Sequence, residues 1–344
     1  MSRHAGGIRR HEAIVVCPCG RGVPCGRCNS ELRIPESEHA CHHDNAADNA
    51  LLAFDSTGTL VQATSTGGRG GVSGNAGGIA AAGRLVAVVN FGSQSVSVFD
   101  VRHSGPVLTD LITTISPPVS VAFGHGHLYV LGTTSVESHQ LYGSHVNSAS
   151  DGSTTLLRAD GSAAQVGVVG DQLLIAEKSN AVEVVELQAG AITGAPVEVP
   201  LPAGSDTPLG LATRGSTGYV TIAHSDEVGL VKGGQLTALV GSGSQHAPCW
   251  LALVGQYLYS SNSPSHSISR YVVSGTHLVL DGEVVATTAG APTDIGAFGT
   301  IVGVLDGGIQ THLTQFAVDE DGNLQQIAVS VVNQGANGVV VVEQ

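Results

Sequence analysis

Aromatic and charged side chains are scarce in this chain of 344 residues. Aromatics make up 4% of it and charged residues 12%, about half of the roughly 25% that is usual. Lys, Glu and Leu are therefore too rare to form heptads, which excludes a coiled coil or helical bundle. A hydrophobic content of 42% is too high for a disordered chain. The glycines have no period of three, which excludes collagen.

Long apolar runs are also missing. No run approaches the roughly 18 residues of a membrane span. The N-terminal basic residues are not followed by the apolar stretch of a signal peptide. We therefore expect a soluble protein without a membrane partner, located in the cytoplasm.

Basic residues are few outside the N-terminus. The first 50 residues hold six Arg and six acidic residues, so the net charge of −14 resides in the remainder. An acidic body lacks the basic face that nucleic acid requires. The expected partners are a small-molecule ligand or another protein, and we expect a monomer.

Cysteine is nearly absent after residue 41, because Cys249 is the one cysteine in the remaining sequence. Four thiols at the N-terminus could surround one tetrahedral Zn²⁺. These are Cys17, Cys19, Cys25 and Cys28. The alternative is a flexible extension, rich in Gly, Arg and Cys, whose thiols bind no metal. We expect this extension to cover residues 1–44 and to precede a single domain over residues 45–344.

Short Val- and Ile-rich runs separated by Gly, Ser, Thr and Asn are what the sequence does contain, and they indicate an all-β fold. An apolar strand, a Gly turn and a second apolar strand recur six times. Successive second strands lie 43, 45, 46, 39 and 43 residues apart, at Leu85, Leu128, Leu173, Tyr219, Leu258 and Ile301. Four short strands every 40–45 residues are typical of a propeller blade.

Six repeats predict six blades, and we expect a seventh to be shared between the chain ends. Gly338–Val342 has the pattern of an innermost strand, while Asn49–Asp55 and Thr59–Ala63 have the pattern of outer strands. Pairing them would close the ring and remove two exposed edges. The prediction is a seven-bladed β-propeller with four antiparallel strands per blade.

Several segments resemble the lactonase-type seven-bladed propeller family, which includes 6-phosphogluconolactonases and carboxymuconate lactonizing enzymes. They are residues 49–60, 65–71 and 88–99, and more weakly residues 177–180 and 247–251. The resemblance implies the propeller fold and a cofactor-free reaction that opens or closes a lactone. It also implies a Pro-His-x-His and a Gly-Pro-Arg-His stretch opening two innermost strands. The corresponding openings here, such as Ala247-Pro-Cys-Trp, contain neither.

Topology predicts where polar residues could form a site. The start of the first strand and the end of the second strand of each blade lie on one face, which we call the mouth face. We expect the catalytic residues there to be Glu177, His246 and Asp294, as carboxylate and imidazole groups able to transfer protons. Ligand-binding residues are expected at Asn90, Gln165, Lys178, His224, Trp250, Asn262 and Asp306. His125, His127 and Arg214 fall on the opposite face, where we expect solvated turns.

Two functions follow. In the first, the protein is a lactone hydrolase or lactonizing cyclase acting on a small lactone or carboxylate at the channel mouth. In the alternative, it is a non-catalytic propeller that binds a ligand or a protein partner, which the missing His and Arg motifs favour. For each candidate site residue a structural role remains open, such as a strand-end ion pair for Glu177 or a plug between blades for Trp250.

Overall fold

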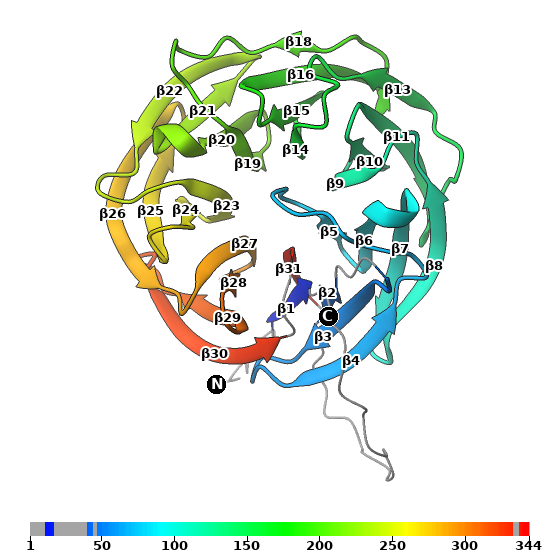
Figure 1. Cartoon of the computed structure of the whole chain (residues 1–344), viewed down its shortest axis with the longest axis horizontal. Helices are drawn as coiled ribbons and strands as arrows, with labels where there is room; N and C mark the ends of the chain where they lie inside the picture. Colours follow the sequence, from blue (N-terminus) through cyan, green and yellow to red (C-terminus); the bar gives the residue numbers. More distant parts are fainter. Residues whose placement is uncertain (1–10, 17–39, 44–46, 333–336, 344) are drawn as a thin grey trace, which may run out of the picture.

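Short β-sheets stand around a central axis, and all but one have their first strand innermost (Figure 1). The computed structural model describes residues 11–16, 40–43, 47–332 and 337–343. Apart from two short 3-10 turns, the regular structure of these residues is strand. The predicted all-β propeller is confirmed.

Six blades are built from consecutive stretches of the chain. Blade 1 contains β5 (Ile79–Ala82), β6 (Leu85–Asn90), η1 (Phe91–Ser93), β7 (Ser95–Arg102) and β8 (Gly105–Thr113). Blade 2 contains β9 (Pro118–Gly124), β10 (His127–Gly132), β11 (Ser135–Tyr142), β12 (His145–Val146) and β13 (Gly152–Thr155). Blade 3 contains β14 (Ala163–Val169), β15 (Gln172–Glu177), β16 (Ala181–Gln188), β17 (Ala191–Ile192) and β18 (Val197–Glu198).

The second half of the ring is more regular. Blade 4 contains β19 (Pro208–Arg214), β20 (Thr217–Ile222), η2 (Ala223–Ser225), β21 (Glu227–Lys232) and β22 (Gln235–Gly241). Blade 5 contains β23 (Pro248–Val254), β24 (Tyr257–Asn262), β25 (Ser267–Ser274) and β26 (His277–Thr287). Blade 6 contains β27 (Ala291–Phe298), β28 (Ile301–Gly307), β29 (Thr311–Val318) and β30 (Leu324–Val332).

The expectation of a seven-bladed ring with four strands per blade is wrong. Within the described ranges there are six blades, and the remaining strands form a five-stranded closing sheet. Its members are β1 (His11–Val16), β2 (Ala40–His43), β3 (Ala50–Phe54), β4 (Leu60–Ser65) and β31 (Val339–Glu343). β3 pairs with β1, β2 and β4. In a regular blade a strand has one neighbour at each edge, so the pairing of residues 51–53 with three strands departs from that pattern.

The error arises from the strand that closes the ring. β31 was expected to pair with residues 49–55, but β1 lies between the two and pairs with β31 through Ala13 and Val341. The sequence analysis had placed residues 11–16 in the extension, where a Gly- and Arg-rich context hid the strand. The expected division at residue 44 stays a prediction for the segments outside the described residues. Blades 2 and 3 depart further, because their outer strands are each broken into two short pieces.

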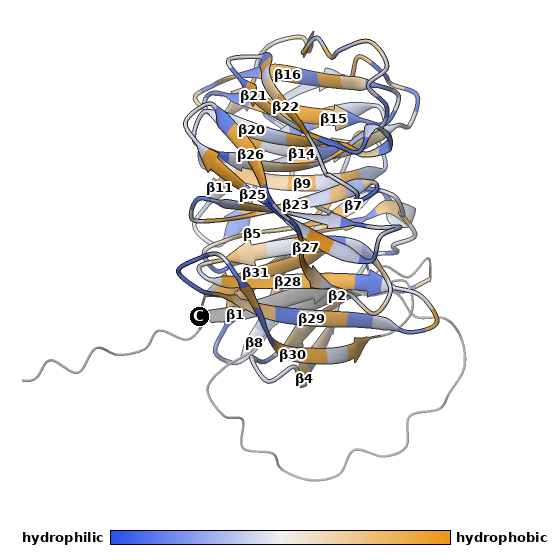
Figure 2. Cartoon of the chain, turned by 90° about the vertical axis from the view of Figure 1, so that its left-hand side faces the viewer, coloured by the Kyte–Doolittle hydropathy of each residue, from blue (hydrophilic) through white to orange (hydrophobic). Residues whose placement is uncertain are grey.

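Second strands are mostly apolar because each is covered on both sides by neighbouring blades. Every residue of β6 and of β10 is buried, including Asn90. Strands buried on both faces carry continuous rather than alternating apolar runs. Figure 2 shows orange stretches along many strands, and also blue stretches inside strands such as β29. Val, Ile and Leu therefore hold the blades together without large aromatic clusters.

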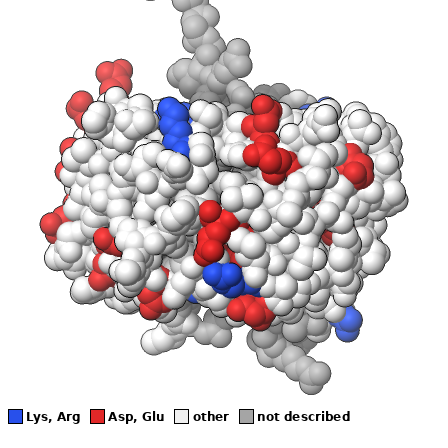
Figure 3. Space-filling model, turned by 90° about the horizontal axis from the view of Figure 1, so that it is seen from above, with Lys and Arg blue, Asp and Glu red and all other residues white. Residues whose placement is uncertain are grey.

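Charge is sparse on the outside of the ring. Seen from above in Figure 3, isolated Asp and Glu side chains interrupt a largely uncharged surface, and Lys and Arg are fewer still. No helix in the described part of the chain is both long and apolar enough to cross a membrane.

Candidate functional site

Asn90 and Asn262 end second strands on the mouth face, and both are fully buried. The Asn90 side-chain amide donates to the hydroxyl of Ser97 at 2.7 Å, and that of Asn262 to Ser269 at 2.8 Å. Each side chain thus joins the end of its second strand to the third strand of the same blade. These expected ligand-binding residues have structural partners in place of an open site.

Glu177 is also fully buried, at the end of β15. Its Oε1 accepts a hydrogen bond from the backbone N–H of Arg158 at 3.0 Å, and Glu183 accepts one from Leu157 at 2.9 Å. The two carboxyl groups tie the connection between blades 2 and 3 to blade 3. Burial and the nearby Glu183 carboxylate raise the pKa of Glu177 to about 8. Burial raises the pKa of Glu183 to about 7.

Asp306 has the same role in blade 6. Its Oδ2 accepts from the backbone N–H of Ala289 at 3.2 Å, and its Oδ1 lies 2.9 Å from Nδ1 of His312. Because the carboxylate is fully buried, these partners replace the hydration that it loses on folding. Asp306 therefore anchors the connection into blade 6.

Asp294 and Gln165 join innermost strands to one another. Asp294 on β27 accepts from the backbone N–H groups of Ile295 at 2.9 Å and Val339 at 2.8 Å. Gln165 on β14 accepts from the backbone N–H of Leu211 on β19. Innermost strands have one edge without a ladder partner, and these side chains satisfy donors on that edge. Burial nevertheless raises the pKa of Asp294 to about 7.

The predicted histidines lie at the surface of the mouth face. His246 has a side chain 68% exposed, and its Nδ1 lies 2.8 Å from Oδ2 of Asp226. His224 is 63% exposed and hydrogen-bonds the Thr207 hydroxyl at 2.9 Å. Both belong to loops of blade 4 and its connection to blade 5, on the outer part of the face.

A glycine-rich loop covers the mouth of the channel. The loop, residues 66–78, connects β4 to β5 and reaches into the centre of the ring (Figure 1). Asn75 is its anchor, because the Asn75 carbonyl accepts from Nε1 of Trp250 at 3.0 Å and its side chain bonds Val119 and Asn337. We call residues 66–78 the mouth loop. It joins blades 2 and 5 to the segment before β31 across the axis.

Beneath the mouth loop lies a central cavity of about 430 Å³. It is lined by the innermost strands β5, β9, β14, β19, β23, β27 and β31. Most lining residues are Val, Ile, Ala, Leu or Phe, with Trp250 near the mouth loop, but the lining exposes polar and apolar atoms in about equal measure. Arg84, whose side chain is 63% exposed, lies at the opposite face where the cavity meets solvent. The volume falls within the range of small-molecule sites.

The three predicted catalytic residues are not brought together. Asp294 lines the central cavity, whereas Glu177 and His246 are absent from its walls. Glu177 faces the connection before β14, and His246 pairs with Asp226 outside the mouth loop. Of the expected ligand-binding residues, Gln165 and Trp250 line the central cavity, and Lys178 lines a separate pocket on the mouth face.

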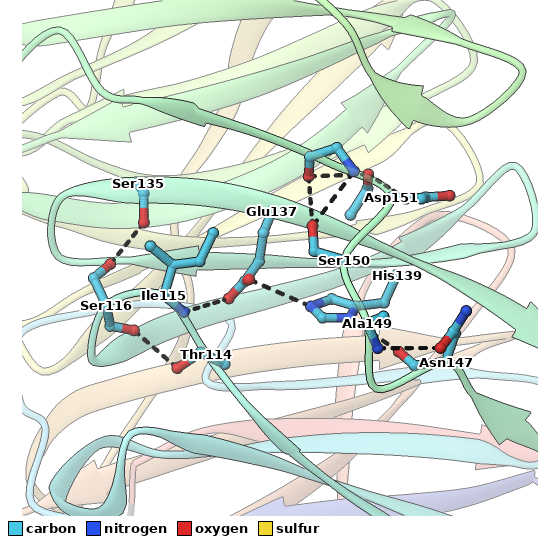
Figure 4. A network of polar contacts seen from close by, with 12 residues as sticks. Thr114, Ile115, Ser116, Ser135, Glu137, His139, Asn147, Ala149, Ser150 and Asp151 are labelled. Carbon is cyan, nitrogen blue, oxygen red and sulfur yellow. Dashed lines mark hydrogen bonds and ion pairs between the residues drawn. The ribbon is translucent and has the colours of Figure 1, made fainter.

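A buried polar network in blade 2 was missed by the sequence analysis (Figure 4). Glu137 accepts from the backbone N–H of Ile115 at 3.0 Å, and its second oxygen lies 3.6 Å from Nε2 of His139. His127, expected in a solvated turn, is buried and lies 2.8 Å from Asp151. The four consecutive polar residues 137–140 of β11 were the available signal, since an alternating strand would be expected there.

The predicted zinc ligands Cys17, Cys19, Cys25 and Cys28 lie outside the described residues, so the zinc site stays a prediction. Among the residues that are described, no group of three or more His, Cys, Asp or Glu side chains is placed to hold a metal ion. Cys249 is buried, and burial raises its pKa to about 11, which suits a core residue.

No family model matches the chain, and no curated protein matches it in sequence. Many solved structures share its fold. One, named a putative 6-phosphogluconolactonase, from Bacteroides fragilis NCTC 9343, is 14% identical with a TM-score of 0.67, covering 97% of this chain and 98% of that one. Another of that name, from Bacteroides uniformis ATCC 8492, is 13% identical with a TM-score of 0.57, covering 81% and 97%.

A functionally unknown protein from Desulfotomaculum acetoxidans DSM 771 is 14% identical with a TM-score of 0.56, covering 72% of this chain and 79% of that one. At these identities the likeness concerns the fold alone. The chain has a lactonase-like propeller fold.

Proposed function

We propose that this chain is a ligand-binding propeller that holds a small molecule with both apolar and polar parts in the central cavity. The observation that carries the proposal is the cavity itself, about 430 Å³ and walled by apolar side chains of the innermost strands. Apolar side chains together with polar groups that orient the ligand are typical of small-molecule sites. Trp250 offers a flat face to such a ligand, and its indole nitrogen is already occupied by Asn75.

Binding without turnover fits the polar groups on the walls. Among the described residues that line the cavity, the titratable side chains are Arg84 and Asp294. Arg84 donates to both oxygens of Asp100, and Asp294 accepts two backbone N–H groups. General acid–base catalysis needs groups that are free to exchange protons with a substrate. Neither residue is free in this way.

Lactone hydrolysis is the second candidate. It is favoured by a pKa of about 7 for Asp294, a value suited to proton transfer near neutral pH, and by the fold shared with proteins named as 6-phosphogluconolactonases. Asp294 would have to act alone as the base, because Glu177 and His246 lie outside the cavity.

The single Trp of the chain makes both candidates testable. Trp250 lines the cavity, so its fluorescence reports occupancy. We suggest titration with δ-decanolactone, an apolar lactone, and with glucono-δ-lactone, a polar one, followed by recovery of each compound. Saturable quenching by δ-decanolactone, with the compound recovered intact, supports the binding proposal. Hydrolysis that is lost in Asp294→Asn and retained in the exposed control Asp171→Asn supports the second candidate. If the titrations show no quenching and no hydrolysis, both candidate functions are contradicted.

A further inference from the structure

A second hollow lies on the mouth face, outside the mouth loop. It measures about 220 Å³, and its walls come from the mouth loop and the ends of blades 1, 2 and 3. Lys178 is its one charged lining residue; Ser73, Asn75, Phe91, Val119 and Thr133 are among the others. We call it the Lys178 pocket.

Lys178 is a half-buried cation that no described carboxylate pairs with. Its Nζ donates to the carbonyl of Gly74 at 2.8 Å. No carboxylate forms an ion pair with it within the part of the chain that the structure describes. An ammonium has three donors, so two remain for a ligand. Burial without a neighbouring anion lowers the pKa of Lys178.

Glu177, although adjacent in sequence, does not neutralise Lys178. Its carboxyl group is fully buried and receives the backbone N–H of Arg158. The charges that act on Glu177 come from Glu183, Asp160 and Arg158. The two neighbouring side chains therefore point to different surroundings.

The rest of the Lys178 pocket is divided between hydroxyls and apolar side chains. The hydroxyls of Ser73 and Thr133 make no hydrogen bond to any described residue. Phe91, Val119 and Val72 supply apolar wall. One free cation and two free hydroxyls suit a group with a single negative charge, and the apolar wall suits a short hydrocarbon tail.

We propose that the Lys178 pocket binds a short-chain aliphatic carboxylate, with the carboxylate at Nζ of Lys178 and the tail against Phe91 and Val119. A phosphate dianion would need more donors than one ammonium and two hydroxyls, and such sites commonly use the bidentate guanidinium of Arg. The two described arginines nearest in sequence to the lining residues are engaged elsewhere, Arg69 with Gly92 and Arg158 with Glu198.

This site is separate from the central cavity. Asn75 lies between them, since it is a lining residue of the Lys178 pocket and its carbonyl accepts a hydrogen bond from Trp250 of the central cavity. The further inference therefore does not depend on the proposed function, and each can fail alone.

The chain contains two lysines, Lys178 and Lys232, which allows a direct test. Lys232 ends β21 and is exposed, so it is a matched control. We suggest labelling lysine with ¹³C and following the two Cε signals during titration with sodium butyrate, neutral butyramide and sodium phosphate. The proposal predicts a saturable shift of the Lys178 signal with butyrate, a rise in the pKa of Lys178, and no saturation at Lys232.

Variants sharpen the result. Lys178→Gln should weaken butyrate binding about tenfold or more, because a charge-assisted hydrogen bond contributes about 1.5–3 kcal/mol. Lys232→Gln should bind as the wild type does. Equal shifts at both lysines, equal binding of butyramide, or saturation by phosphate without butyrate would each overturn the proposal. The wild-type titration decides the question even if Lys178→Gln is unstable.

Discussion

Nε1 of Trp250 lies 3.0 Å from the backbone carbonyl of Asn75, 175 residues earlier in the chain. This hydrogen bond fixes the mouth loop to the innermost strand of blade 5. The loop lies over the mouth-face end of the central cavity, and Arg84 lies at the opposite end, where we expect a ligand to enter. The mouth face keeps the smaller Lys178 pocket.

Removal of this hydrogen bond should weaken the protein. Trp250→Phe keeps an aromatic side chain but leaves the carbonyl of Asn75 without its donor. A buried hydrogen bond contributes about 1 kcal/mol, and the loss of volume adds to this. We expect the free energy of unfolding to fall by about 1–3 kcal/mol, measured by circular dichroism in urea. An unchanged midpoint would show that the mouth loop is not held by Trp250.

A substitution at Gly77 tests how closely the mouth loop is packed. Its φ of +62° is strained for an L-residue, and an added Cβ would lie 2.9 Å from the Ser120 hydroxyl. Gly83 has a similar φ of +57° with open space around it, which makes Gly83→Ala the control. We expect Gly77→Ala to destabilise by at least about 1 kcal/mol more than Gly83→Ala. Equal melting temperatures for the two variants would contradict the close packing of the loop.

Asp294 should matter for stability whether or not it acts in chemistry. In Asp294→Ala the backbone N–H groups of Val339 and Ile295 lose their acceptor. Each buried unsatisfied group costs about 1–3 kcal/mol. We expect a loss of about 2 kcal/mol or more, and a smaller loss for Ser120→Ala, which removes the acceptor of one strand N–H, that of Val166. Chemical denaturation of both variants compares them directly.

Stability should fall as the pH rises from about 4.5 to about 8. The pKa of Glu177 is raised from 4.5 to about 8 in the folded protein, so the folded state binds more protons than the unfolded state across this range. The stabilisation that this difference in proton binding contributes is fully present below pH 4.5 and is lost progressively up to about pH 8. Glu183 and Asp294 act in the same direction.

Glu177→Gln isolates the contribution of this residue. Gln keeps an oxygen for the backbone N–H of Arg158 and carries no charge. We expect the variant to lose less stability than the wild type between pH 5 and pH 8.5, by at least about 1 kcal/mol. Glu320→Gln, in an exposed turn, should follow the wild type. Parallel pH profiles for all three proteins would mean that Glu177 is ionised at little cost.

The repeat of apolar strands predicted the propeller, because burial between blades constrains each second strand locally. The closing sheet could not be predicted in the same way. Its pairing joins residues 11–16 to residues 339–343, and nothing in a single strand encodes which distant edge it meets.

The candidate site was only partly predictable. Topology placed Glu177, Asn262 and Asp306 correctly at the ends of second strands on the mouth face. It could not show that their polar atoms are bound to neighbouring backbone and hydroxyl groups, because those partners come from connections of irregular length. It also gave no sign that the mouth loop covers the channel, since the loop was a Gly-rich stretch without a strand pattern.

The most direct measurement of the central claim is the single indole N–H signal in a ¹⁵N spectrum of the protein. With one Trp in the chain, the signal belongs to Trp250. If the central cavity binds small molecules with apolar and polar parts, δ-decanolactone will shift this signal saturably, the shift will be the same in Lys178→Gln, and the lactone will be recovered unchanged. A signal that stays in place throughout the titration would contradict the account.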